Sequence, residues 1–185
     1  MRHHAHPVPR LRRVLATVLG CAMAAATTLF MAGPAHAASS TTCTGTSNVT
    51  YSPGLTLTPQ TIAVSETDTL TSCTSTDTTL TAGYMGPYAF SVPNAGCNYL
   101  PGVGNDGVRI HWNNGQTSDV PLTIVLTATG GIVQETGTGT VAAGEFTGAT
   151  VVITWIYPVV NPLQCLLPGG VTAHNGTIVA QITGL

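Results

Sequence analysis

The strongest secondary-structure signal in the chain is the stretch VRIHWNNGQTSDVPLTIVLTA, residues 108–128. Apolar and polar side chains alternate in 108–112 and again in 120–128, which is the period of a strand with one buried face. The sequence NNGQ, residues 113–116, separates the two runs, and Asn-Gly pairs are typical of tight hairpin turns. The stretch therefore predicts a β-hairpin.

The chain on either side has the same character. Alternation with period two returns at 61–65 and 177–183, whereas no window shows a convincing helical period. Residues 151–157 are apolar on both faces, which predicts a central strand that is covered on both sides. Short strands separated by turns predict an all-β fold, an antiparallel β-sandwich of the immunoglobulin-like or a related Greek-key type, with about seven to nine strands.

Three segments do not fit this strand pattern. Residues 92–106 and 158–170 are rich in proline and glycine, and we expect both to be long loops. Residues 67–81 are rich in Thr, Ser and Asp and are consistent with either a solvated edge strand or a loop. His174 precedes Asn175-Gly176, a pair that predicts a turn.

The first 37 residues resemble an export signal. Arg10, Arg12 and Arg13 precede an uncharged apolar run, and Ala35-His36-Ala37 provides small residues at a cleavage site. We expect a signal peptide over 1–37, cut after Ala37, and one secreted domain over 38–185. Two alternatives remain open: an uncleaved membrane anchor, and lipid anchoring at Cys21 within the sequence VLGC.

The expected mature domain has an even number of cysteines, which in an exported chain predicts two disulfides. Cys97 and Cys165 each lie in one of the proline-rich loops, and a bond between them would restrict two long irregular segments. That favours Cys97–Cys165 and leaves Cys43–Cys73, which would tie the first strand to the third. Four cysteines allow three pairings, so the sequence favours this pairing without deciding it.

Charge excludes one class of function. There is no lysine, and Arg109 is the only arginine beyond the N-terminal segment, so the domain cannot neutralise a phosphate backbone and is not expected to bind nucleic acid. The acidic residues all lie beyond that segment, and we expect them to be solvated turn residues: Glu66, Asp68, Asp77, Asp106, Asp119, Glu135 and Glu145.

Four short motifs resemble those of small secreted proteins from actinobacteria. They are TCTGT at 42–46, TYSPGLT at 50–56, WNNGQTS at 112–118 and GTVAAGEFTG at 139–148. The resemblance implies a secreted, disulfide-containing β-domain. It implies no catalytic residue and no ligand.

The usual catalytic and metal-binding patterns are weak in this chain. His111 and His174, with Asp106 or Asp119, have no short ligand spacing, so we expect two exposed histidines and no metal or cofactor. No Gly-x-Ser-x-Gly elbow is present, and all four remaining cysteines are better used in disulfides, so we expect no catalytic residue.

Aromatic residues offer the remaining candidates. Trp112 and Trp155 share faces with aliphatic neighbours and are expected in the core. Tyr84, Tyr88 and Tyr99 flank a loop and could contact a sugar or protein. The sequence therefore predicts a non-catalytic, monomeric interaction module of the bacterial extracellular space or cell envelope, with an extracellular protein or glycan as partner. The alternatives are a carbohydrate-binding protein that uses these tyrosines, an enzyme inhibitor built on the loops around Cys97 and Cys165, and a small secreted hydrolase.

Overall fold

The computed structural model describes residues 39–98 and 103–184, and these form an antiparallel β-structure with a single short 3-10 helix, as the all-β prediction requires. The predicted cleavage site after Ala37 and the cysteine Cys21 lie outside the described residues. Within the described ranges, no helix has the length and hydrophobicity needed to cross a bilayer. The elements are β1 (Ser40–Leu55), β2 (Gln60–Ser75), β3 (Gly83–Ala95), β4 (Val103–Trp112), β5 (Thr117–Thr129), β6 (Ile132–Thr140), β7 (Ala143–Gly144), β8 (Thr150–Pro158), η1 (Gln164–Leu166) and β9 (Val171–Thr183).

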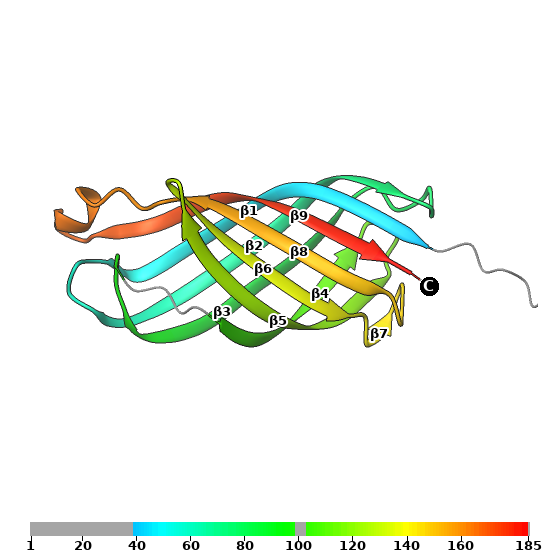
Figure 1. The fold of residues 1–185 in the computed structure, drawn as a ribbon, viewed down its shortest axis with the longest axis horizontal. Helices are drawn as coiled ribbons and strands as arrows, with labels where there is room; N and C mark the ends of the chain where they lie inside the picture. The colour runs from blue at the N-terminus through cyan, green and yellow to red at the C-terminus, as the bar shows by residue number, and fades with distance from the viewer. Residues whose placement is uncertain (1–38, 99–102, 185) are drawn as a thin grey trace, which may run out of the picture. The chain divides into compact units, whose positions relative to one another are not determined.

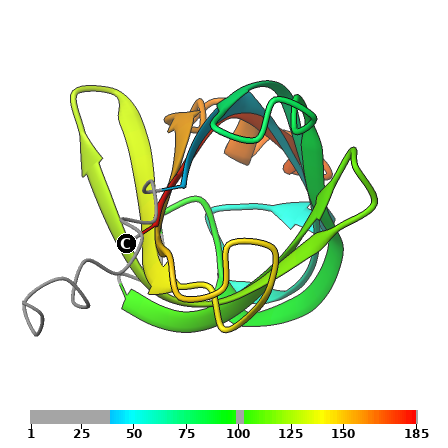
Figure 2. The ribbon, with the colours of Figure 1, turned by 90° about the vertical axis from the view of Figure 1, so that its right-hand side faces the viewer.

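The strands close into one barrel, so the prediction of a sandwich was wrong (Figures 1 and 2). The sheet runs in the order β4-β3-β2-β1-β9-β8-β6-β5, and β4 also pairs with β5, which joins the two edges. The predicted hairpin 108–128 is confirmed, and it makes this closing contact. Alternation shows only that each strand has one apolar face, and that face can be buried by a second sheet or by closing the same sheet.

A closed barrel has no second layer, and β8 shows the consequence. Its inward side chains Val151, Ile153, Trp155 and Tyr157 are buried, while those between them are half-exposed. The expectation of a strand covered on both faces was therefore wrong for the outer face. Trp112 and Trp155 both lie in the core, as predicted.

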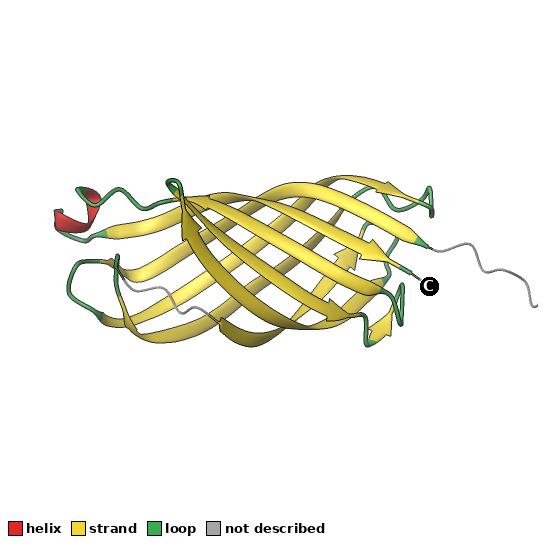
Figure 3. Cartoon of the chain, viewed as in Figure 1, coloured by secondary structure: helices red, strands yellow, loops and turns green. Residues whose placement is uncertain are grey.

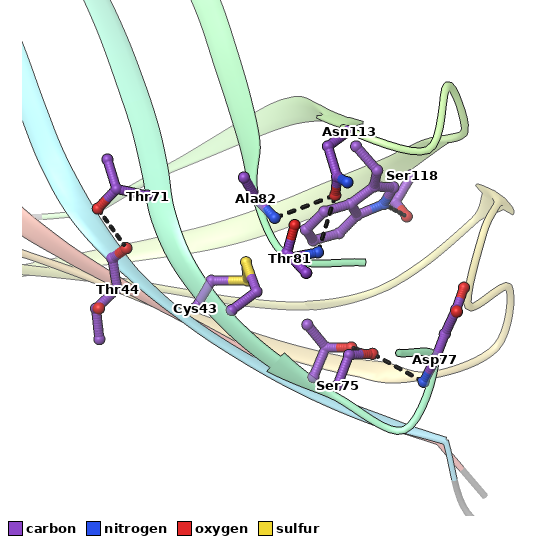
Figure 4. Close-up of a disulfide and its surroundings, with 12 residues drawn as sticks. Cys43, Thr44, Thr71, Ser75, Asp77, Thr81, Ala82, Asn113 and Ser118 are labelled. Atoms are coloured by element: carbon purple, nitrogen blue, oxygen red, sulfur yellow. Dashed lines mark hydrogen bonds between the residues drawn. A yellow bond between two sulfur atoms is a disulfide. The ribbon is translucent and has the colours of Figure 1, made fainter. Parts of the chain in front are cut away.

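One end of the barrel is filled with side chains. Leu70, Leu80 and Val141 are buried there, and Trp112 meets Phe146 edge-on with ring centroids 5.9 Å apart. Asn113 ties two loops together at this end, because its Oδ1 accepts from the backbone N–H groups of the neighbouring loop at 2.9 and 3.1 Å (Figure 4). This end is closed.

The disulfide Cys43–Cys73 lies toward the same end and joins β1 to β2 at register partners (Figure 4). The bond is the one that the sequence favours, but its strands are neighbours, not the first and third. The segment 67–81, for which the sequence predicts an edge strand or a loop, begins as part of β2. This strand continues to Ser75 and pairs with β1 on one side and β3 on the other.

The other end carries the irregular segments (Figure 3). Residues 159–170 form the predicted loop with η1 inside it, whereas the predicted loop 92–106 is partly strand, because β3 continues to Ala95 and β4 begins at Val103. The disulfide Cys97–Cys165, the second pair that the sequence favours, connects these two segments with a Cα–Cα distance of 6.3 Å. His174 lies inside β9 opposite Val49, so the predicted turn at this point was wrong.

Candidate functional site

The barrel contains a cavity of about 200 Å³ at the end that holds Cys97–Cys165. Strands β1, β2, β3, β5, β6, β8 and β9 all contribute to its wall. Most of that wall is apolar: Val49, Leu55, Ile62, Val64, Phe90, Val92, Ala95, Leu126, Val133, Val159 and Val160. Four polar side chains complete it: Tyr51, Glu66, Glu135 and Tyr157, with His174 beside Tyr157.

The acidic side chains enter the barrel because they occupy inward positions of regular strands. In β2, residues 62, 64, 66, 68 and 70 share one face, and the burial pattern continues along it. Glu66 and Asp68 therefore lie on the same face as Ile62. In β6, Glu135 follows the buried Val133 by two residues. The expectation that these three acids are solvated turn residues was wrong.

A hydrogen-bonded polar cluster lies around Glu66. The Tyr157 hydroxyl donates to Oε1 of Glu66 at 3.2 Å. Oγ of Ser47, which is fully buried, lies 2.7 Å from the Tyr157 hydroxyl and 3.3 Å from Oε1 of Glu66. Tyr157 and Ser47 therefore hold the Glu66 carboxyl in place on the cavity wall.

Asp68 lies deeper, with a relative exposure of 0%. Its Oδ2 accepts a hydrogen bond from Nε1 of Trp155 at 3.1 Å, and its Oδ1 has no hydrogen-bond partner. Buried polar atoms in folded proteins nearly always have a partner, so an unpaired carboxylate oxygen is an uncommon feature that calls for an explanation.

The protein interior shifts the pKa values of these groups. Burial, and after it the negative charges of Asp68 and Glu135, raises the pKa of Glu66 from 4.5 to about 7. Burial, followed by Asp68 and Asp106, raises the pKa of Glu135 from 4.5 to about 7. Burial also raises the pKa of Asp68, and it raises the pKa of Tyr51 to about 12. Glu66, Glu135 and the deeper Asp68 are therefore easier to protonate than a surface carboxyl.

No cationic side chain compensates these acids within the described part of the chain. The arginine there, Arg109, forms a surface ion pair with Asp119, with 2.6 Å between Nε and Oδ1. His174 lies at the cavity, but its Nε2 contacts the carbonyl oxygen of Pro158 at 2.6 Å and its ring lies beside Tyr157. The interior is therefore acidic without a basic partner.

Of the tyrosines singled out by the sequence, the two described ones, Tyr84 and Tyr88, lie outside the cavity and contact β4. Tyr84 and Tyr88 lie in β3, not in a loop, and Tyr99 lies outside the described residues. Tyr84 is 48% exposed and stacks on His111 with ring centroids 4.7 Å apart. The Tyr88 hydroxyl accepts from the backbone N–H of Arg109 at 3.2 Å, where β3 and β4 no longer pair. These two side chains have structural contacts and do not line the cavity.

His111 and His174 are also far from forming a metal centre. His111 stacks on Tyr84, while His174 is at the cavity. Among residues 39–98 and 103–184, no three His, Cys, Asp or Glu side chains are grouped so that they could hold a metal ion.

The buried Trp155–Asp68 contact gives a prediction with an internal control. We expect Trp155→Phe to lower the free energy of unfolding by about 2 kcal/mol more than Trp112→Phe, because it removes the donor from a buried carboxyl. Trp112 donates to Ser118 at 2.9 Å, and Ser118 keeps its bond to the Glu145 carbonyl in the control variant. Urea unfolding of both variants measures the difference, and equal losses would contradict the prediction.

Compared with known proteins, the chain matches no protein-family model, no curated protein and no solved structure.

Proposed function

We propose that the protein is an exported, non-catalytic binding protein that takes one small, largely apolar molecule into the open end of its barrel. The observation that carries the proposal is the cavity of about 200 Å³, whose wall is mostly apolar with a few polar groups. This combination is typical of small-molecule sites, and a barrel of this strand number has room for one such ligand.

The size of the cavity limits the ligand. An apolar cavity of roughly 150 Å³ is enough to hold benzene, so the volume here suits one ring or a short alkyl chain. A polymeric glycan does not fit inside such a space. A glycan site would need an exposed aromatic surface instead, and Tyr84, which is 48% exposed and stacked on His111, lies outside the cavity lining.

Export is part of the same proposal. The two disulfides indicate an oxidising compartment. The arginines, apolar run and Ala35-His36-Ala37 of the N-terminal segment support secretion through a cleaved signal peptide. A role in the extracellular space then means capture of a small molecule there.

The contacts of the polar cluster around Glu66 support the proposal that the protein is not a catalyst. Ser47 is the buried hydroxyl next to Glu66, and its described partners are Glu66 and Tyr157. Nucleophilic catalysis by a serine needs an adjacent base such as histidine, and His174 instead contacts the Pro158 carbonyl.

Filling the cavity tests the proposal. We expect benzyl alcohol to bind the wild-type domain, and we expect Val133→Phe to weaken that binding by about tenfold or more, because the new ring occupies the cavity. Val125→Phe is the matched control, since Val125 is 45% exposed and lies outside the cavity lining. Protein NMR titration measures the affinity and locates the site.

Two results would contradict the proposal. One is that benzyl alcohol leaves the resonances of Val64, Leu126 and Val133 unchanged in the wild-type protein. The other is that both phenylalanine variants, folded by circular dichroism, bind the probe as well as wild type does.

A further inference from the structure

The acids of the cavity lie on opposite walls of the barrel. In the closed strand order, β2 and β6 are separated by β1, β9 and β8 on one side and by β3, β4 and β5 on the other. Glu66 from β2 and Glu135 from β6 both line the cavity, and Glu135 adds to the negative potential at Glu66. A molecule in the cavity therefore lies between two carboxyl groups.

Asp68 provides a second, independent observation. It belongs to the same inward face of β2 as Glu66, it is fully buried, and its Oδ1 has no hydrogen-bond partner. The described residues supply no hydrogen-bond donor to this oxygen, and Asp68 lies behind Glu66 and outside the cavity lining. Three acids of the interior therefore lie near one another, and the described residues place no cationic side chain beside them.

Resting on the proposed function, we infer that the ligand is an organic ammonium: a primary or secondary amine on a single ring or short alkyl chain, with its charged nitrogen between Glu66 and Glu135. The apolar wall accommodates the hydrocarbon, and the two carboxylates accept the N–H donors in charge-assisted hydrogen bonds. Asp68 adds a further negative charge behind Glu66.

Other ligand charges fit less well. An anion would meet Glu66 and Glu135, with Asp68 behind them, and no cationic arginine or lysine side chain from the described residues. A neutral apolar molecule would fill the wall but leave the acceptors unpaired, which weakens its binding relative to an amine of the same shape.

Binding an ammonium also changes protonation inside the barrel. The titratable groups that line the site are Tyr51, Glu66, Glu135, Tyr157 and His174. Asp68 and Asp106 act on these glutamates from outside the cavity lining. Because Glu66 and Glu135, with pKa values of about 7, are partly protonated near neutral pH when no ligand is present, a bound ammonium releases protons from them. Proton release therefore distinguishes an ammonium seated on the acids from one bound elsewhere.

The test compares benzylamine, benzyl alcohol and benzoate, which share a ring and differ in the charge of the substituent. We expect calorimetry near neutral pH to give an affinity for benzylamine at least about tenfold above that for benzyl alcohol, and no detectable binding of benzoate. Titrations in two buffers of different ionisation enthalpy should show that benzylamine, unlike benzyl alcohol, releases protons.

Matched variants locate the effect. We expect Glu66→Gln and Glu135→Gln each to weaken benzylamine binding by about tenfold, and to weaken it by a larger factor than any change in benzyl alcohol binding. Circular dichroism shows whether each variant is folded. Glu145→Gln is the control, because Glu145 lies outside the cavity lining, and it should change neither affinity.

The outcomes separate the two proposals. If benzyl alcohol binds and Val133→Phe blocks it, but benzylamine binds no more tightly, the ammonium inference is overturned and the small-molecule function stands. Equal benzylamine affinity in wild type and in the Glu66→Gln/Glu135→Gln double variant would overturn the inference as well. If none of the three probes binds, the proposed function fails and the inference with it.

Discussion

The free energy of unfolding is expected to fall as the pH rises from the ordinary glutamate pKa of 4.5 through about 7, the raised pKa of Glu66 and of Glu135. The folded protein holds these two protons more tightly than the unfolded chain does. Protonation therefore favours the folded state below this range, and the advantage is lost as both groups ionise. Each glutamate contributes roughly 3 kcal/mol, and the pair less than twice that because their mutual repulsion counts once.

Urea unfolding at a series of pH values measures this slope. The Glu66→Gln/Glu135→Gln double variant should reduce it, because an amide does not ionise, and leave the contribution of Asp68, whose pKa burial also raises. Glu145→Gln should keep it, since no buried acid is altered. A stability that rises between mildly acidic and neutral pH in the wild-type protein would contradict both the burial of these acids and the lack of a compensating cation.

Local chemistry made much of the fold predictable. The alternation in 108–112 and 120–128 with the Asn-Asn-Gly-Gln turn predicts a hairpin, and β4 and β5 form it. The proline-rich segment predicted as a loop over 158–170 is one from residue 159 onward, with η1 inside it. In each case neighbouring residues supply the whole signal, so no long-range information is needed.

Closure of the sheet was not predictable in the same way. Closure is possible only because β4, which pairs with β5 in the hairpin, also pairs with β3 over Gly83–Met85, next to the tight turn of the hairpin. It depends on strand twist and on how the two edges meet, and a period-two pattern is the same for a barrel and a sandwich. The sandwich prediction failed for this reason.

The candidate site was missed because its residues look like surface residues. The alternation of Ile62 and Val64 continues through Glu66 and Asp68 to the buried Leu70, and that continuation was the available signal. Charged residues are rarely buried without a partner, so composition favours the solvated interpretation. Such exceptions to local rules are expected where a protein binds a ligand, and here they concentrate at one end of the barrel.

The disulfides at the two ends of the barrel have different structural roles. Cys43–Cys73 joins adjacent strands that already pair along their length, and Cys43 is fully buried. Cys97–Cys165 joins two irregular segments, and Cys97 lines the cavity. The first bond stabilises a packed wall, whereas the second holds the rim of the site.

Removing Cys97–Cys165 by the double substitution Cys97→Ser/Cys165→Ser is expected to lower the free energy of unfolding by about 4 kcal/mol. The bond closes a chain segment with a sequence separation of 68, and loops of this length lose unfolded-state entropy of about that size when cross-linked. The same variant should weaken benzyl alcohol binding, because the segment around Cys97 and the loop at Val159 and Val160 are no longer held against the cavity.

The double substitution Cys43→Ala/Cys73→Ala separates the loss of stability from the loss of benzyl alcohol binding. The two cysteines have a sequence separation of 30, so removing their bond should lower the free energy of unfolding by about 3.5 kcal/mol. Loss of packing around the buried Cys43 lowers it further. We expect urea unfolding to show a large loss in both double variants and NMR titration to show weakened binding only when Cys97 and Cys165 are replaced. Unchanged affinity in that variant, under conditions where it is folded, would mean that the rim of the cavity keeps its shape without the bond, and that the disulfide serves stability alone.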